Sequence, residues 1–150
     1  MKMKYITPPS WDIEGVTDMS LFLDCLGLVA NENSILVLED ANFDRFGGEA
    51  LRKIAVHPDV ELRHGIASPP PEFIFIPYTP ANIARMKSVI AETGYVNLCA
   101  HLHMFEGTEM KFSWWDTLDL PIAFHPSYPE DTIKEIASMC KATCSFKETF

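Results

Sequence analysis

The sequence has few basic residues and no long hydrophobic run. Its 150 residues contain 12 Lys and Arg against 21 Asp and Glu, which gives a formal net charge of −9. Electrostatic binding to nucleic acid or to an anionic membrane surface requires clustered Lys and Arg, so we expect neither partner. A spanning helix needs about 18 apolar residues, and the richest apolar stretch, residues 21–30, is interrupted by Asp24 and Gly27.

The first eleven residues lack the apolar region of a secretory signal, because Lys2 and Lys4 are followed at once by Thr7, Pro8 and Pro9. We therefore expect a cytoplasmic protein. Its four cysteines are then expected to be free thiols, since a chain of this length can build a core without disulfides.

Two of these cysteines, Cys140 and Cys144, have a spacing typical of one face of a helix. Zinc sites favour Cys-x2-Cys or Cys-x4-Cys pairs on turns, together with a second pair of ligands elsewhere. We interpret Cys140 and Cys144 as core residues of the last helix.

Motifs for nucleotide binding and nucleophilic catalysis are also missing. The chain contains no G-x-x-x-x-G-K-[ST], G-x-G-x-x-G or G-x-S-x-G pattern, and none of its cysteines has a recognisable catalytic context. We therefore expect no cofactor, and the sequence favours a non-enzymatic protein.

Hydrophobic residues make up 47% of the chain, which is enough to build a single globular domain from residues 1–150. Periodicity, capping residues and proline positions predict helices at about 18–30, 49–56, 80–93 and 127–143. Strands are predicted at 34–39, 60–63, 72–78 and 121–124, with a β-hairpin at 95–105 and 109–115. This order indicates an α/β or α+β fold, with a mixed sheet of about five strands and about four helices.

The hairpin carries the most suggestive spacing for chemistry, His101-x-His103. Two residues apart on a strand, both imidazoles point to one face and could bind one metal ion. Asp116 or His125 could supply a third ligand. The alternatives are a polar, solvent-facing sheet surface and a binding face on which Trp115 serves as an anchor.

The register of the hairpin decides which residues face the two histidines. A two-residue loop at Gly107-Thr108 would set Glu106 opposite Glu109, so that two like charges meet. A three-residue loop pairs Phe105 with Glu109 and places Met110, Phe112 and Trp114 in the apolar row. We predict the second arrangement, in which His101, His103, Lys111, Ser113 and Trp115 share the other face. Lys111 then lies across from His103, where its charge disfavours a metal.

Acidic residues are concentrated in the first half of the chain. Residues 12–61 contain eleven acidic residues and three basic ones, a net charge of −8. Such a charge suits a basic partner, because complementary fields speed association. Four of these acidic residues lie at the end of the strand at 34–39 or soon after it and are candidates for ligand or partner contacts: Glu39, Asp40, Asp44 and Glu49.

Two functions remain open from the sequence. The first is a binding protein without enzymatic activity, an immunity-type or regulatory partner of a basic protein, which uses the acidic first half or the face that carries His101 and Trp115. The alternative is a small metal-assisted enzyme that uses His101 and His103 with Asp116 or His125. A homodimer formed through the hairpin is a further option.

Overall fold

The computed structural model describes residues 2–39, 48–62, 72–94 and 96–149. Its main feature is a sheet of seven strands in which all neighbours are antiparallel. In spatial order the strands are β5 (Phe73–Pro77), β3 (Ser34–Glu39), β6 (His101–Glu106), β7 (Glu109–Trp114), β8 (Ile122–Phe124), β2 (Ser10–Glu14) and β9 (Thr143–Lys147). A separate parallel pair joins β1 (Lys2–Met3) to β4 (Glu61–Leu62).

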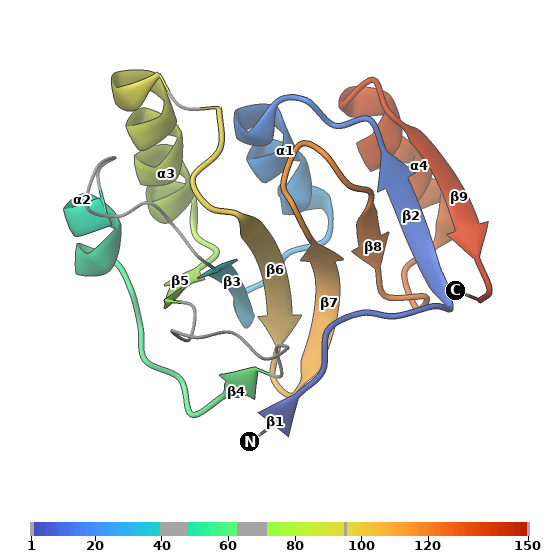
Figure 1. Ribbon diagram of the computed structural model, residues 1–150, viewed down its shortest axis with the longest axis horizontal. Coiled ribbons are helices and arrows are strands. Elements are labelled where there is room, and N and C mark those ends of the chain that lie inside the picture. Colours follow the sequence, from blue (N-terminus) through green and yellow to red (C-terminus); the bar gives the residue numbers. More distant parts are fainter. Residues whose placement is uncertain (1, 40–47, 63–71, 95, 150) are drawn as a thin grey trace.

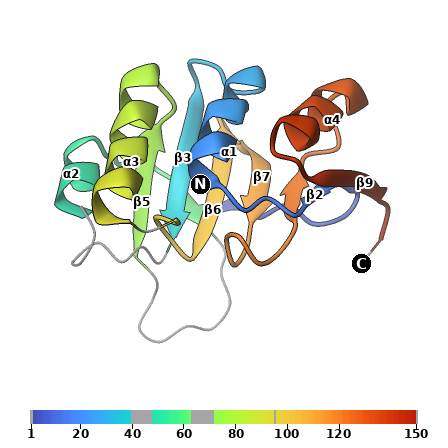
Figure 2. The same ribbon diagram turned by 90° about the horizontal axis from the view of Figure 1, so that it is seen from above.

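Helices cover one face of the seven-stranded sheet, as Figure 2 shows. They are α1 (Met19–Cys25), which continues into the 3-10 helix η1 (Leu26–Leu28), α2 (Gly48–Lys53), α3 (Pro80–Thr93) and α4 (Glu130–Met139). In the described part of the chain, no helix is long and apolar enough to cross a membrane.

Local signals explain where α1 and α3 begin and end. The Asp18 side chain accepts a hydrogen bond from the amide of Leu21, and Thr79 accepts one from the amide of Asn82. Such caps satisfy backbone donors that have no partner inside the helix. Gly94 ends α3 with a left-handed φ of 73°, which glycine adopts without strain.

The larger core lies between the sheet and the helices. Phe22 of α1 is fully buried there, and its ring contacts Phe112, Trp114 and Phe124 at centroid distances of 5.5, 5.0 and 6.3 Å. Edge-to-face aromatic contacts of this kind add to the stabilisation from burial itself.

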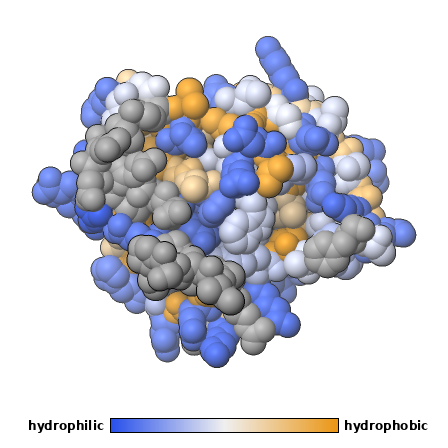
Figure 3. Space-filling view, viewed as in Figure 1, coloured by the Kyte–Doolittle hydropathy of each residue, from blue (hydrophilic) through white to orange (hydrophobic). Residues whose placement is uncertain are grey.

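A smaller core lies on the opposite face of the sheet, where β1 and β4 pack. Its buried residues are Met3, Val37, Leu62, Phe105 and Met110. Because β3 contributes Leu36 and Leu38 to the larger core and Val37 to the smaller one, it is covered on both faces, as its continuous apolar run predicts. Figure 1 views the molecule from the side of the smaller core, and Figure 3 shows this side as a mostly hydrophilic surface with small, separate hydrophobic patches.

Of the predicted alternatives, α/β or α+β, the structure has the second, and the predicted number of about four helices is confirmed by four α-helices in the described residues. The described residues form nine strands where six strand segments were predicted, since β1, β2 and β9 were not predicted, and the main sheet has seven strands instead of about five. The last helix also differs from the prediction. It begins after Pro129 without a side-chain cap and ends at Met139, so Cys144 lies in β9 and does not share a helical face with Cys140.

The turn between β6 and β7 is shorter than we predicted. Glu106 pairs with Glu109, so the loop consists of two residues, Gly107 and Thr108. Each carboxylate has its own partner, which offsets their mutual repulsion. Glu106 accepts a hydrogen bond from Ser34 Oγ at 2.8 Å, and Glu109 accepts one from Lys111 Nζ at 2.6 Å.

A register shift restores most of the predicted faces. Beyond the pair Phe105–Met110, the next pair is Met104–Phe112, so Lys111 is an extra residue in β7. Phe112 therefore lies on the helix side as predicted, whereas Met110 joins the smaller core. A bulge of this kind lets a strand keep its buried face while the turn changes length.

Candidate functional site

The shifted register changes which residue lies opposite His103. Ser113, and not Lys111, pairs with His103. The positive charge that we expected beside this histidine is instead bound to Glu109. The electrostatic argument against a cation at His103 therefore does not hold.

Five residues predicted to have a functional role meet on the sheet face opposite the helices. Glu39 comes from β3, His101 and His103 from β6, Ser113 from β7, and Trp115 follows β7. Glu39 pairs with His101 across the β3–β6 ladder, and the Trp115 ring lies 4.7 Å from that of His101 and 4.9 Å from that of His103. The sequence correctly placed His101, His103, Ser113 and Trp115 on one face, whereas Glu39 was predicted only as one of the acidic candidates and not as their neighbour.

This face is covered by another segment of the chain. One of our interpretations of the sequence was a polar sheet surface that faces solvent, and the structure differs from it. The N-terminal segment, residues 2–6, crosses it on the way from β1 to β2 (Figure 1). The amide of Ile6 donates a hydrogen bond of 3.0 Å to Ser113 Oγ. The Tyr5 ring contacts the rings of His103 and Trp115 at 4.6 and 4.5 Å. His103 and Ser113 are consequently buried.

We refer to Tyr5, Glu39, His101, His103 and Trp115 as the histidine cluster. At its centre, one carboxylate oxygen of Glu39 binds two side chains. Tyr5 Oη donates to Glu39 Oε2 at 3.2 Å, and His103 Nε2 lies 3.1 Å from the same oxygen. A buried carboxylate is stabilised by such bonds, since an unpaired charge would be costly in this environment.

The second ring nitrogen of His103, Nδ1, is buried without a hydrogen-bond partner among the described residues. Burial lowers the pKa of His103, and the nearby His101 lowers it further, whereas the bond to Glu39 opposes both effects. His103 is therefore neutral at pH 7. In the tautomer in which Nε2 carries the proton and donates a hydrogen bond to Glu39, Nδ1 holds a free lone pair.

His101 and His125 have different partners. His101 Nδ1 accepts a hydrogen bond of 2.9 Å from the amide of Asp116, so these two residues are adjacent as the metal hypothesis requires. His125 lies apart from them, with its Nε2 3.7 Å from Glu109. In the described part of the chain, no group of three or more His, Cys, Asp or Glu side chains is arranged to hold a metal ion.

The acidic candidates are not gathered at the histidine cluster. Glu39 is its buried centre, but Glu49 is exposed on α2, in the helical layer. Asp40 and Asp44 lie outside the described residues.

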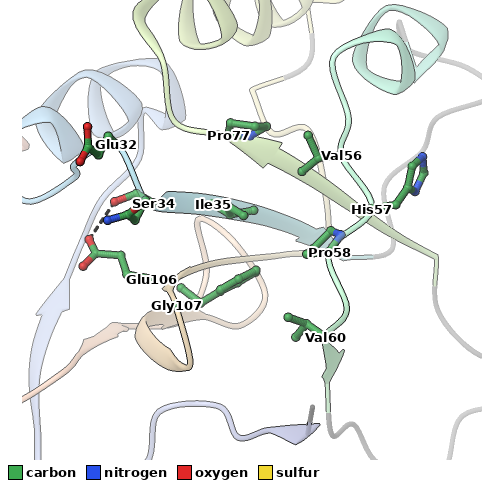
Figure 4. A pocket seen from close by; sticks show the side chains of 12 residues that line it. Glu32, Ser34, Ile35, Val56, His57, Pro58, Val60, Pro77, Glu106 and Gly107 are labelled. Atoms are coloured by element: carbon green, nitrogen blue, oxygen red, sulfur yellow. Dashed lines mark hydrogen bonds between the residues drawn. The ribbon is translucent and has the colours of Figure 1, made fainter.

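A cavity of about 800 Å³ opens at the other end of β3 and β6, on the side of the smaller core. We call it the strand-end cavity. Figure 4 shows Glu32, Ser34 and Glu106 grouped at one end, with Val56, Pro58 and Val60 at the other. Ile35 and the buried ring of Phe105 also line it.

The strand-end cavity combines apolar walls with carboxylates on one side. Glu32 is exposed, and Glu106 is half-buried with one oxygen bound to Ser34 Oγ at 2.8 Å. The described residues that line it include no Lys or Arg. A concave site with apolar walls and a few polar groups is typical of ligand and peptide binding.

Sequence reasoning missed Tyr5 and the strand-end cavity. Tyr5 is 34 residues from Glu39 along the chain, and no local pattern connects the two. Glu32 lies just before one buried strand and Glu106 at the end of another. Polar side chains at the ends of neighbouring strands come together, and this position was the one sequence signal for the cavity.

Comparison of the chain with protein-family models, with curated proteins and with solved structures finds no match.

Proposed function

We propose that this protein is a cytoplasmic, non-enzymatic binding protein for a basic protein partner, in an immunity-type or regulatory role. The strand-end cavity carries the proposal, because its carboxylates, Glu32 and Glu106, stand beside apolar walls. It suits a segment of the partner that presents Lys or Arg.

A Lys or Arg side chain has two parts that match the two parts of the cavity. Its aliphatic stem can lie against Ile35 and Phe105, while its charged end reaches Glu32 and Glu106. An aromatic ring such as Phe105 also attracts a cation that passes over its face. The site would therefore discriminate against acidic segments, whose carboxylates would be repelled.

The overall charge supports the same partner. The acidic residues of the first half do not form one face, since Glu14 lies on β2, Asp24 on α1, Glu49 on α2 and Glu61 on β4. They contribute instead to the net charge of −9. A field of this kind speeds the approach of a basic protein, and local contacts then select the binding site.

The test is a titration followed by NMR with a nine-residue peptide of alternating Arg and Leu. We expect shifts of the amides of Ile35, Val60 and Phe105, and weaker binding at 0.5 M salt, because salt screens exposed charges. The charge-reversed peptide with Glu in place of Arg is expected not to bind.

Charge-neutral variants assign the binding to the cavity. The double variant Glu32→Gln/Glu106→Gln is expected to bind about fivefold more weakly, which corresponds to about 1 kcal/mol for two partly screened charge contacts. Glu135→Gln changes an exposed carboxylate of α4 and serves as the control. Equal affinity of the double variant and the wild type, or shifts confined to another face, would contradict the proposal.

The alternative of a small metal-assisted enzyme that uses His101 and His103 stays a prediction. Metal analysis of untagged protein purified without chelators, together with thermal unfolding in the presence of zinc or manganese, tests it separately, because a bound metal stabilises the native state.

A further inference from the structure

The two edges of the seven-stranded sheet are protected differently. At the β5 edge, Val56 forms a bridge with Phe75, and its amide donates a 2.8 Å hydrogen bond to the Phe75 carbonyl. β5 also ends in Pro77. Bridges and prolines are common means of preventing an edge strand from pairing with another chain.

The β9 edge lacks these protections. β9 pairs with β2 through five residue pairs in continuous register, and no described strand pairs with its other side. β9 contains no proline. Figure 1 shows it at the outer edge of the sheet, with α4 behind it. Its outer side therefore leaves backbone donors and acceptors open to a further strand.

Apolar side chains are exposed at the same edge. Phe146 of β9 is 44% exposed and contacts the Trp11 ring at 4.9 Å, and Met139 at the end of α4 is 46% exposed. Exposed apolar groups beside an unpaired strand are typical of an interaction surface.

We propose that β9 is a dimerisation strand, which pairs antiparallel with β9 of a second copy of this chain. A two-fold axis at Ser145 sets Ser145 opposite its own copy, Cys144 opposite Phe146, and Thr143 opposite Lys147. This register uses all five residues of the strand, and any shift leaves part of β9 unpaired. The two sheets then form one continuous sheet across an isologous interface.

The side chains are self-complementary in this register. Cys144 and Phe146 lie on the face that β2 lines with Ile13 and Trp11, so the dimer extends an apolar row. On the other face, Glu14 pairs with Thr143 within one copy, and Thr143 lies opposite Lys147 of the second copy. Glu14 and this Lys147 are therefore two strands apart on the same face. Two strand spacings span about 10 Å, a distance that extended Lys and Glu side chains can bridge. The two-fold axis produces this opposite-charge pair twice.

The dimer is independent of the proposed function. β9 lies at one edge of the sheet, whereas β3 and β6 line the strand-end cavity nearer the other edge. Both copies would therefore keep their cavities open to a partner.

Sedimentation velocity of the full chain between about 1 and 300 µM tests the oligomeric state. We expect dimers whose fraction rises with concentration, and a monomer at every concentration would overturn the proposal. Ser145→Asp is the first variant, because it sets two like charges directly opposite each other across the axis. The new carboxylate also lies opposite Asp12 of β2 in its own chain, so the thermal unfolding of this variant is measured as well. We expect its dimer to be at least about tenfold weaker at low salt.

Matched variants separate the interface from effects on folding. Ser145 is exposed, and so is Ser88 on α3, so Ser88→Asp introduces the same change away from β9 and is expected to dimerise like the wild type. Ser145→Lys is expected to be weakened alone and to form a mixed dimer with Ser145→Asp that is stronger than either homodimer. Dimerisation that Ser145→Asp leaves unchanged, or the absence of a stronger mixed dimer, would overturn the β9 pairing. Thermal unfolding of each variant verifies its fold.

Discussion

His103 is a buried histidine whose ionisation is linked to folding. Burial lowers its pKa in the native state, whereas in the unfolded chain the pKa is about 6.5. Below pH 6.5 the unfolded chain therefore binds a proton that the native protein does not. Stability is unaffected by this group above pH 6.5 and decreases as the pH falls through 6.5 towards the native pKa.

We expect the free energy of unfolding, measured with urea between pH 8 and pH 5, to fall below pH 6.5 by up to about 1.4 kcal/mol per pH unit. The variant His103→Gln keeps a donor for Glu39 and removes the titration, so its curve is expected to be flatter. His57→Gln removes an exposed histidine instead and is the matched control. An unchanged slope in His103→Gln would assign the pH dependence to other groups.

Two half-buried tyrosines differ in what their hydroxyl groups bind. Tyr5 Oη donates to Glu39, and Tyr128 Oη is buried without a partner among the described residues. Burial raises the pKa of both groups. We expect Tyr5→Phe to lower the free energy of unfolding by about 1–2 kcal/mol, because a hydrogen bond to a carboxylate is lost. Tyr128→Phe removes an unsatisfied polar group and is expected to be neutral or slightly stabilising. Equal losses in the two variants would show that the Glu39 bond does not stabilise the fold.

At the scale of elements, the β6–β7 turn depends on one backbone conformation. Gly107 has a φ of 59°, and an added Cβ would meet no atom within 4 Å. The effect of Gly107→Ala is therefore conformational strain alone. We expect a loss of about 1–2 kcal/mol in urea unfolding, and a smaller loss for Gly107→Asn, since asparagine tolerates positive φ better than alanine. Identical stability of the alanine variant and the wild type would contradict this account of the turn.

Local sequence signals predicted the elements whose start and end are marked by residues of the element itself. β3 is a continuous apolar run, and α3 has both Thr79 as its cap and Gly94 at its end. The shared face of His101, His103, Ser113 and Trp115 followed from the alternation of side chains along strands. These elements could be predicted because each signal lies within a few residues.

The remaining elements depend on partners distant in sequence. β2 is a strand because β8 and β9 pair with it on either side. In β9, Cys144 and Phe146 alternate with polar residues, which is typical of a strand. The helical spacing from Cys140 to Cys144 led us to predict a helix there instead. The turn of the hairpin depends on Ser34 and Lys111, which bind Glu106 and Glu109, and sequence alone does not show these contacts.

For the whole molecule, the N-terminal segment completes the face opposite the helices. Met3 is buried in the smaller core, and Ile6 and Tyr5 bind Ser113 and Glu39. We expect removal of residues 1–6 to lower the free energy of unfolding by about 3–5 kcal/mol. The side chains of Met3 and Tyr5 lose their packing, and the hydrogen bonds to Ser113 and Glu39 are lost. The truncated protein is also expected to bind the dye ANS, which reports exposed apolar surface.

The control for this truncation is the double variant Lys2→Ala/Lys4→Ala. Both lysines are exposed, and we expect stability within about 0.5 kcal/mol of the wild type. A truncated protein as stable as the wild type would mean that the smaller core does not contribute to the fold.

Trp114 and Trp115 are consecutive in the sequence and lie in different environments. Trp114 is fully buried in the larger core against Phe22, whereas Trp115 contacts Tyr5 and both histidines of the cluster. Their fluorescence therefore reports on opposite sides of the sheet. We expect emission from Trp115 to respond to the position of the N-terminal segment, because its ring contacts Tyr5, and emission from Trp114 to respond to the packing of the helices, because its ring contacts Phe22. The third tryptophan is Trp11 of β2. With Trp11 and either Trp114 or Trp115 replaced by Phe, the remaining indole would follow detachment of the N-terminal segment or melting of the helical layer as a separate optical signal.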